Sequence, residues 1–200
     1  MQIRPATEAD REGLYRVCLR TSANGDDGTH LWSDPDLVGH NFVGPYLAFE
    51  PSTTFALVDG TDIVGYSIAA PDTRAFEAYF NDVWAPPLRR AYPLGQLADG
   101  HWTEHDRWAI ERLHQGLHLE SIVADPYPAQ AHIDLLPAAQ GQGLGRRMMQ
   151  AALDVVRDAG APGIHLDVSP ENLRARGFYA HLGFAQGPCV GGHSYLVRTL

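Results

Sequence analysis

The chain has 200 residues, of which 44% are apolar, and it carries a formal net charge of −9. This length and apolar content suit one compact domain with a buried core. No apolar stretch is long enough to span a membrane, the N-terminus has no apolar segment typical of a signal peptide, and the acidic balance argues against nucleic acid as a partner. We therefore expect a cytoplasmic protein that binds neither membranes nor nucleic acids.

The N-terminal third of the sequence predicts a strand, a helix and a hairpin. A strand over Met1–Pro5 precedes a helix over Glu8–Arg20, for which Thr7 is a suitable N-cap. A long irregular stretch follows over Thr21–Ser52, with one short helix around Asp36–Phe42. The turn signal Asp59-Gly60 then joins two hairpin strands, which we expect over Thr53–Asp59 and Thr61–Ala70.

Residues 71–119 read as a helical insertion into a single domain that spans residues 1–200. The Pro86-Pro87 pair must break or terminate a first helix, and a charged helix is expected around Thr103–Leu113. Two histidine pairs, His101/His105 and His114/His118, have a spacing that places both side chains on one helix face. Neither pair has the sequence context of a zinc site, so we expect exposed histidines and no metal.

Residues 131–159 predict a strand, a glycine-rich loop and a helix in direct succession. Three alternating glycines stand in the loop, Gly141, Gly143 and Gly145. A loop of this kind exposes backbone N–H groups at the positive end of the helix dipole, where no side chain prevents a phosphate from approaching. The segment therefore predicts a site for a phosphorylated cofactor.

The residues of this loop exclude two common phosphate-binding motifs. A P-loop requires Lys and Ser or Thr after its last glycine, but Arg146 and Arg147 stand there, and the dinucleotide motif would require glycine at position 146. Gln140–Gly145 instead resembles the Q/R-x-x-G-x-G/A loop of the GNAT superfamily of acetyltransferases. A second signature of that family, N-x-x-A-x-x-x-Y-x-x-x-G-F, is matched by Asn172, Ala175, Tyr179, Gly183 and Phe184.

This resemblance covers residues 131–184 and implies the α/β fold of the family. That fold is a mixed, mostly antiparallel sheet of about six or seven strands with helices on both faces. Its two central parallel strands, near 131–136 and 163–168, should splay apart to admit the cofactor. The last strand, expected over His193–Thr199 after the Gly191-Gly192 turn, should lie beside the strand that begins at Phe184, and it could pair across a homodimer.

A narrower resemblance concerns the insertion, whose sequence between Gly65 and Pro93 is similar to the acetyltransferase-like domain of the eukaryotic O-GlcNAc hydrolase and to its stand-alone bacterial relatives. The eukaryotic domain is generally regarded as non-catalytic. Two functions follow from the resemblance. The first is an acetyl-CoA-dependent N-acetyltransferase that acts by direct attack in a ternary complex. The alternative is a non-catalytic module that binds acyl-CoA or another protein.

The resemblance also implies which residues contact acetyl-CoA. Strand backbone groups would pair with the pantetheine arm, and loop amides would hold the pyrophosphate. The cofactor-binding residues expected on this basis are Leu135, Leu136, Gln140, Gly141, Gln142, Gly143, Leu144, Gly145, Arg146, Asn172 and Tyr179. Asn172 could equally cap the following helix without any ligand.

Acetyl transfer to an amine needs a base for the ammonium and an acid for the leaving thiolate. Tyr179 is the natural acid, because a phenol is protonated at neutral pH. Asp134 and His132 project from one face of the same strand and are the candidate base, although the glutamate of many family members is missing. They form either a catalytic pair or a structural one. Cys18 and Cys189 lack any signature of a catalytic thiol.

Charge is unevenly distributed along the chain and bears on the acceptor. Residues 1–72 carry 11 acidic against 4 basic side chains, whereas residues 131–200 carry 5 against 6. The cofactor segment therefore does not repel a polyanion, and the acidic remainder favours an amine-bearing acceptor, either a small molecule or a protein. Trp32, close to Asp34 and Asp36, could help to form an amine-binding pocket.

Overall fold

The computed structural model describes residues 1–200 and is organised around one sheet of seven strands in the order β1-β2-β3-β4-β5-β7-β6. Every neighbouring pair is antiparallel except β4 and β5, which are parallel. The strands are β1 (Gln2–Pro5), β2 (Thr54–Asp59), β3 (Asp62–Ala70), β4 (Ala129–Leu135), β5 (Gly163–Asp167), β6 (Ala185–Val190) and β7 (His193–Thr199). This confirms the expected sheet, including β7 beside β6.

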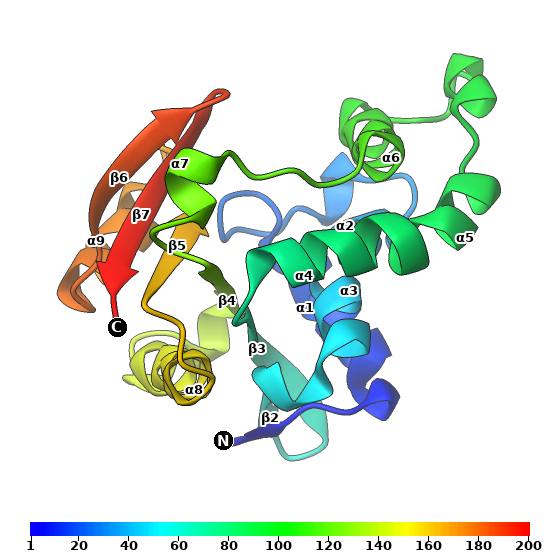
Figure 1. Cartoon of the computed structure of the whole chain (residues 1–200). Helices are drawn as coiled ribbons and strands as arrows, with labels where there is room; N and C mark the ends of the chain where they lie inside the picture. Colours follow the sequence, from blue (N-terminus) through cyan, green and yellow to red (C-terminus); the bar gives the residue numbers. More distant parts are fainter.

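Helices cover both faces of the sheet (Figure 1). They are α1 (Arg11–Thr21), α2 (Leu37–Asn41), α3 (Val43–Phe49), α4 (Thr73–Tyr79), α5 (Ala85–Ala91), α6 (Glu104–Gln115), α7 (Ser121–Ala124), α8 (Leu144–Asp158) and α9 (Leu173–His181). Helix α8 packs on one face, where Met148 meets Leu57 of β2. Helices α1 and α3 pack on the other, where Leu14 meets Tyr66 of β3. No helix has the length and apolar character needed to cross a membrane.

The central parallel strands separate soon after they meet. Only Ala129↔Ile164 and Gln130↔His165 are paired between β4 and β5. Beyond Gln130 the strand β4 continues to Leu135 with a partner on its β3 side alone. The expected splay is therefore present, and it leaves one edge of β4 open in the middle of the sheet.

The Pro86-Pro87 pair changes the helix without ending it, contrary to the expectation of a break. The α-helical pattern gives way to a π-helical turn over Phe80–Trp84, and α5 resumes at Ala85. Both prolines then stand in the first turn of α5, where a missing N–H costs nothing. The wider turn, with Ala85 N–H bonded to the Phe80 carbonyl, supplies the change of register that the prolines need.

The Thr21–Ser52 stretch is more regular than the sequence suggests. The short helix expected around Asp36–Phe42 is present as α2, but a second helix, α3, follows it directly. Gly44 and Pro45 lie inside α3, so local propensity argues against that helix. Packing explains it, since a Cβ on Gly44 would stand 2.2 Å from the Tyr15 hydroxyl and 2.9 Å from the Trp84 ring.

Candidate functional site

The loop before α8 has the backbone geometry of an anion-binding nest. Gly141 and Gly143 have φ angles of +74° and +73°, in the left-handed region that favours glycine. Gly143 is the N-cap of α8, a helix of 15 residues, so the N–H groups of the first helical turn point toward the loop. Nothing lies within 4 Å of the place where a Cβ would stand on either glycine. The loop therefore fits a pyrophosphate held by backbone N–H groups.

The open edge of β4 supplies a second set of backbone groups. Leu136 donates its N–H to the Val64 carbonyl at 2.9 Å, on the β3 side. Since alternate residues of a strand direct their backbone groups to opposite neighbours, those of Ile133 and Leu135 face the gap. The Gln140 side chain crosses to the Leu135 carbonyl at 2.7 Å and so ties the nest to the strand. An extended ligand can pair with this edge.

Two adjoining cavities, each of about 500 Å³, lie along the gap. The loop cavity is lined by residues of the nest, among them Gln140, Gly143 and Arg146. The aromatic cavity is lined by Trp32, Phe42 and Trp108, among others. Both cavities share the following residues: Thr21, Gly25, Asp134, Asn172 and Ala175. The two spaces therefore meet at these residues, with Asp134 among them, and we call the two cavities together the groove.

Asp134 is held by side chains from two strands. The Tyr66 hydroxyl of β3 donates to Asp134 Oδ2, and His132 Nε2 lies 3.1 Å from the same atom. No hydrogen bond is made to Asp134 Oδ1. Burial by itself lowers the pKa of His132, but the neighbouring carboxylate of Asp134 outweighs it and raises that pKa above its ordinary value. Burial and the same carboxylate raise the pKa of Tyr66, which stays a hydrogen-bond donor.

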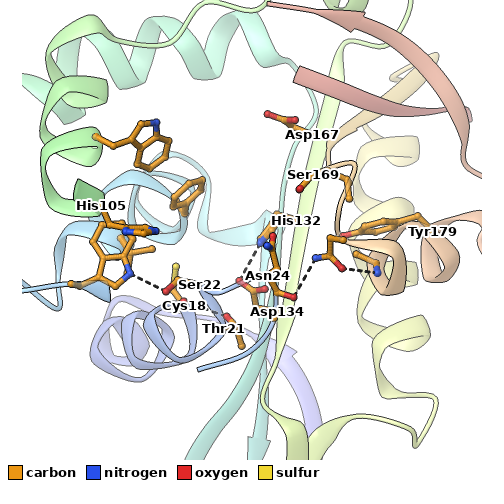
Figure 2. A pocket seen from close by; sticks show the side chains of 18 of the residues that line it. Cys18, Thr21, Ser22, Asn24, His105, His132, Asp134, Asp167, Ser169 and Tyr179 are labelled. Atoms are coloured by element: carbon orange, nitrogen blue, oxygen red, sulfur yellow. Dashed lines mark hydrogen bonds and ion pairs between the residues drawn. The ribbon is translucent and has the colours of Figure 1, made fainter. Parts of the chain in front are cut away.

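Tyr179 lies on the opposite side of Asp134 from His105 (Figure 2). Its ring packs edge-on against Phe178 and Phe184, and the residue is 4% exposed, yet it lines the aromatic cavity. Its hydroxyl has no hydrogen-bond partner within the chain. Burial and the charge of Asp134 raise the pKa of Tyr179, so the phenol keeps its proton.

A short turn bridges the groove. Ala23 and Asp26 pair across it, and Asn24 and Gly25 at its tip both have positive φ angles, 55° and 94°. Asn172 Nδ2 donates to the Asn24 carbonyl at 3.4 Å. A Cβ on Gly25 would stand 2.3 Å from Arg174 Nη2, so the Arg174 guanidinium lies against the turn. We call residues 23–26, with these contacts to α9, the bridging turn.

Two polar side chains complete the junction with α9. Arg174 Nη1 donates to Gln140 Oε1 at 3.0 Å and thus reaches the nest. Asn172 caps α9, because its Oδ1 accepts from the Ala175 N–H at 3.0 Å. The capping role anticipated for Asn172 is therefore present, and its side chain also lines both cavities.

The aromatic cavity draws its walls from distant parts of the sequence. Trp32 comes from the segment before α2, Phe42 follows α2, and Trp108 lies on α6. Three carboxylates also line it: Glu104, Asp134 and Asp167. Neither Asp34 nor Asp36 does, and Asp34 instead accepts a hydrogen bond from the Tyr92 hydroxyl at 2.9 Å. Trp32 thus lines a pocket, but its acidic partners differ from those expected.

The structure brings most of the anticipated site residues together. His132 and Tyr179 line the aromatic cavity, Leu135, Gly141, Gly145 and Arg146 line the loop cavity, and Asp134 lines both. Gln142, Leu144 and Leu136 line neither, the first being exposed and the other two buried. No sequence pattern marks Tyr66, Glu104, Trp108 or Asp167 as a site residue. No group of three or more His, Cys, Asp or Glu side chains could hold a metal ion.

Known proteins resemble this chain in sequence and in fold. The model of the "Acetyltransferase (GNAT) family" matches residues 22–184. Protein O-GlcNAcase of Rattus norvegicus is 26% identical over 185 residues, which are 90% of this chain and 20% of that protein. The chain thus spans about a fifth of that relative. A mycothiol acetyltransferase of Beutenbergia cavernae is 52% identical over 48 residues, 24% of this chain and 16% of that enzyme.

Two solved structures extend the comparison. The structure of SsHAT superposes with a TM-score of 0.88 at 34% identity, and the match covers 99% of this chain and 97% of that one. The PaiA N-acetyltransferase of Thermoplasma acidophilum, solved in complex with coenzyme A, superposes with a TM-score of 0.59 at 11% identity over 100% of this chain and 98% of that one. At that identity the likeness is one of fold.

Proposed function

The chain belongs to the GNAT family of acetyltransferases, and we propose that it transfers an acetyl group from acetyl-CoA to an amine by direct attack in a ternary complex. The observation that carries the proposal is the meeting of the two cavities at Asp134. One side offers a nest for a polyanion. The other side offers an acidic, aromatic space for a cationic acceptor.

The nest and the open edge of β4 are the parts that would hold the cofactor. The pyrophosphate would lie on the amides between Gly141 and Gly145, assisted by the charge of Arg146. The amide-bearing arm would pair with Ile133 and Leu135, whose backbone groups face the gap. Acetyl-CoA, as co-substrate, supplies an acetyl group already activated as a thioester.

His132 is the base in this proposal. An ammonium acceptor must lose a proton before its nitrogen can attack, and a neutral imidazole beside a carboxylate suits that task. Asp134 Oδ2 orients His132, and its Oδ1 is free to accept a hydrogen bond from the ammonium. Asp134 thereby positions both the base and the acceptor.

Tyr179 is the acid in this proposal. Its raised pKa keeps the phenol protonated, and no group of the protein competes for its hydroxyl. The hydroxyl donates its proton to the thiolate as the acetyl–sulfur bond breaks, and the phenolate regains a proton from the newly acylated nitrogen. The proton that His132 took from the ammonium returns to solvent. The net transfer leaves an amide and a thiol, with no covalent enzyme intermediate.

The alternative is a non-catalytic module that binds acyl-CoA or a protein, which the similarity to a segment of protein O-GlcNAcase keeps in view. We further propose that residues 1–200 form one domain, with residues 71–119 as an insertion, and that the protein acts in the cytoplasm.

The presence of Tyr179 as an acid and of the oriented Asp134–His132 pair favours the enzyme over the module.

Calorimetric titration with acetyl-CoA, with CoA and ATP for comparison, tests the cofactor. Micromolar binding of acetyl-CoA without binding of ATP is expected, and thiol release with a panel of amines then tests turnover. Binding without thiol release on any amine would favour the module. No binding of either CoA species would refute the enzyme and the acyl-CoA-binding module, leave the nest as a structural feature and turn the search to a protein partner.

A further inference from the structure

The end of the aromatic cavity farthest from Tyr179 is formed by α6. In Figure 2 His105 of α6 stands across the cavity from Tyr179, with His132 and Asp134 between them. Glu104 and Trp108 also line the cavity, and a spacing of four residues puts them on one helix face, a turn apart. The cavity thus has a reactive end at Asp134 and a distal end at Glu104 and Trp108.

The distal end combines exposed aromatic surface with an unpaired carboxylate. Trp108 is 47% exposed although it is a large aromatic side chain, and it stacks on Phe42 with 6.0 Å between ring centroids. Glu104 makes no ion pair or hydrogen bond with another side chain of the protein. An aromatic face beside a carboxylate is a site for an organic cation, which both groups attract.

The wider charge balance of the cavity points the same way. Its lining includes three carboxylates and two histidines, His105 and His132, but no arginine or lysine. The Arg112 guanidinium packs 5.3 Å from the Phe42 ring and 5.9 Å from the Trp108 ring, but it donates to the Asn41 carbonyl and does not line the cavity. It supports the aromatic wall and offsets only part of the negative charge.

We propose that the distal end, made by Glu104, Trp108 and Phe42, binds a second cationic group, so that the acceptor is an aliphatic diamine or polyamine. This inference rests on the proposed N-acetyltransferase function. One amine reacts at Asp134 while the other is held against α6. A cavity of about 500 Å³ lies in the range of small-molecule sites, which favours such an acceptor over a folded protein surface.

The test compares diamines with monoamines of equal length. Cadaverine and spermidine are assayed for thiol release against pentylamine, in which a methyl group replaces the second ammonium. The second cation is expected to raise kcat/KM about tenfold or more, mainly through KM. Equal kcat/KM for cadaverine and pentylamine would overturn the proposal, as would acetylation of a lysine peptide with no activity on diamines.

Variants of α6 locate the effect. Glu104→Gln should raise KM for cadaverine about fivefold, and Trp108→Leu about tenfold, in each case several times more than the same variant raises KM for pentylamine. Trp108→Phe should recover most of the loss, because it keeps an aromatic face. Glu111→Gln, on the same helix but outside the cavity, is the matched control. Losses that are equal for diamine and monoamine would assign Glu104 and Trp108 a structural role.

A binding measurement separates this inference from the proposed function. Cadaverine is titrated calorimetrically into the protein saturated with CoA. Binding that weakens in Glu104→Gln supports the distal site even when no amine is acetylated, in which case only the catalytic proposal fails. Absence of cadaverine binding in the CoA-saturated protein overturns the distal site, whatever the protein does to other amines.

Discussion

The hydroxyl of Tyr66 donates a hydrogen bond to Asp134 Oδ2, the same oxygen that His132 contacts through Nε2. One carboxylate oxygen therefore contacts both a neutral donor, the Tyr66 hydroxyl, and a titratable group, the His132 imidazole. The pKa of His132 therefore depends on whether the Tyr66 hydroxyl also donates to this oxygen. Tyr66 acts through Asp134 and does not line either cavity, so it is a positioning residue.

Tyr66→Phe should raise the pKa of His132, because the carboxylate loses a neutral donor that shares its charge. His132 must be neutral to accept a proton, so the acidic limb of kcat/KM against pH moves to higher pH, with about a tenfold loss of kcat. Tyr195→Phe, which removes a hydroxyl that makes no hydrogen bond in the protein, should leave the profile unchanged. A uniform loss of rate with no shift of the limb would contradict the role given to Tyr66.

Asp134→Asn should move the same limb in the opposite direction. The carboxylate is what raises the pKa of His132 against the effect of burial, so its removal lets that pKa fall. The acidic limb then lies at lower pH, and the plateau rate drops about tenfold to a hundredfold because the acceptor and the base are no longer positioned. The pH–rate profiles of the two variants are the measurement, and an unmoved limb in Asp134→Asn would exclude His132 as the base.

Tyr179→Phe should slow turnover about a hundredfold while acetyl-CoA affinity stays within about twofold of that of the parent protein. The hydroxyl contributes a proton and has no structural hydrogen bond to lose, and the ring still packs on Phe178 and Phe184. Steady-state rates and calorimetry together check this expectation. An unchanged rate in the variant would show that the thiolate leaves without help from Tyr179.

Gly143→Asp should abolish binding of acetyl-CoA by placing a carboxylate at the nest. The backbone strain of the substitution is separable, because Gly160 has a similar φ angle, +81°, and equally open surroundings at the other end of α8. Gly160→Asp should cost a similar stability, about 1–2 kcal/mol, and leave binding intact. Calorimetry and thermal unfolding of the pair distinguish repulsion from strain, and intact binding in Gly143→Asp would remove the nest from the cofactor site.

Asp10→Asn should destabilise the protein at neutral pH and much less in acid. Two hydrogen bonds of 2.7 Å from Arg4 are the main cause that lowers the pKa of Asp10 from 3.8 to about 2. A depressed carboxyl pKa adds stability above the unfolded pKa, and this stability is lost as pH falls through about 2. The shift corresponds to about 2 kcal/mol at most.

Denaturant unfolding of Asp10→Asn at pH 7 and near pH 2 measures this contribution. A loss of about 1–2 kcal/mol at pH 7 should shrink in acid. Asp82→Asn, at an exposed position without a partner, should change neither value by more than about 0.5 kcal/mol. A loss that persists unchanged in acid would mean that Asp10 acts through its packing rather than its charge.

The parts of the site that are formed by continuous segments could be predicted from the sequence. The nest from Gln140 to Gly145 and the α9 signature from Asn172 to Phe184 are continuous segments, and their residues and spacing indicated the family. The resemblance to that family then implied the sheet and the splayed strands, which the structure contains. The family is confirmed by the family model. The resemblance to a segment of protein O-GlcNAcase is confirmed as well, and SsHAT, a chain of similar length, has a closely similar fold. The roles given to individual residues remain predictions.

The aromatic cavity could not be predicted because its walls come together only through tertiary packing. Trp32 and Phe42 precede the hairpin, whereas Trp108 lies inside the insertion that follows it, and no local pattern relates the three. Tyr66 is hidden for another reason. Tyr66 lies in a buried strand, where the sequence pattern does not distinguish a tyrosine with a polar role from an aromatic residue of the core. Only the strand register, which pairs Tyr66 with Asp134, identifies its hydrogen-bond partner.

The bridging turn has a consequence for how the protein would respond to its ligands. Residues 23–26 touch the nest through Arg174 and border both cavities at Gly25. A wall shared by two sites couples the two affinities, because a ligand that orders the wall lowers the cost of ordering it for the other ligand. Each ligand must then change the affinity of its neighbour by the same factor. Substitutions at Asn24 or Gly25 would therefore alter the cooperativity between the two ligands as well as the affinity of each.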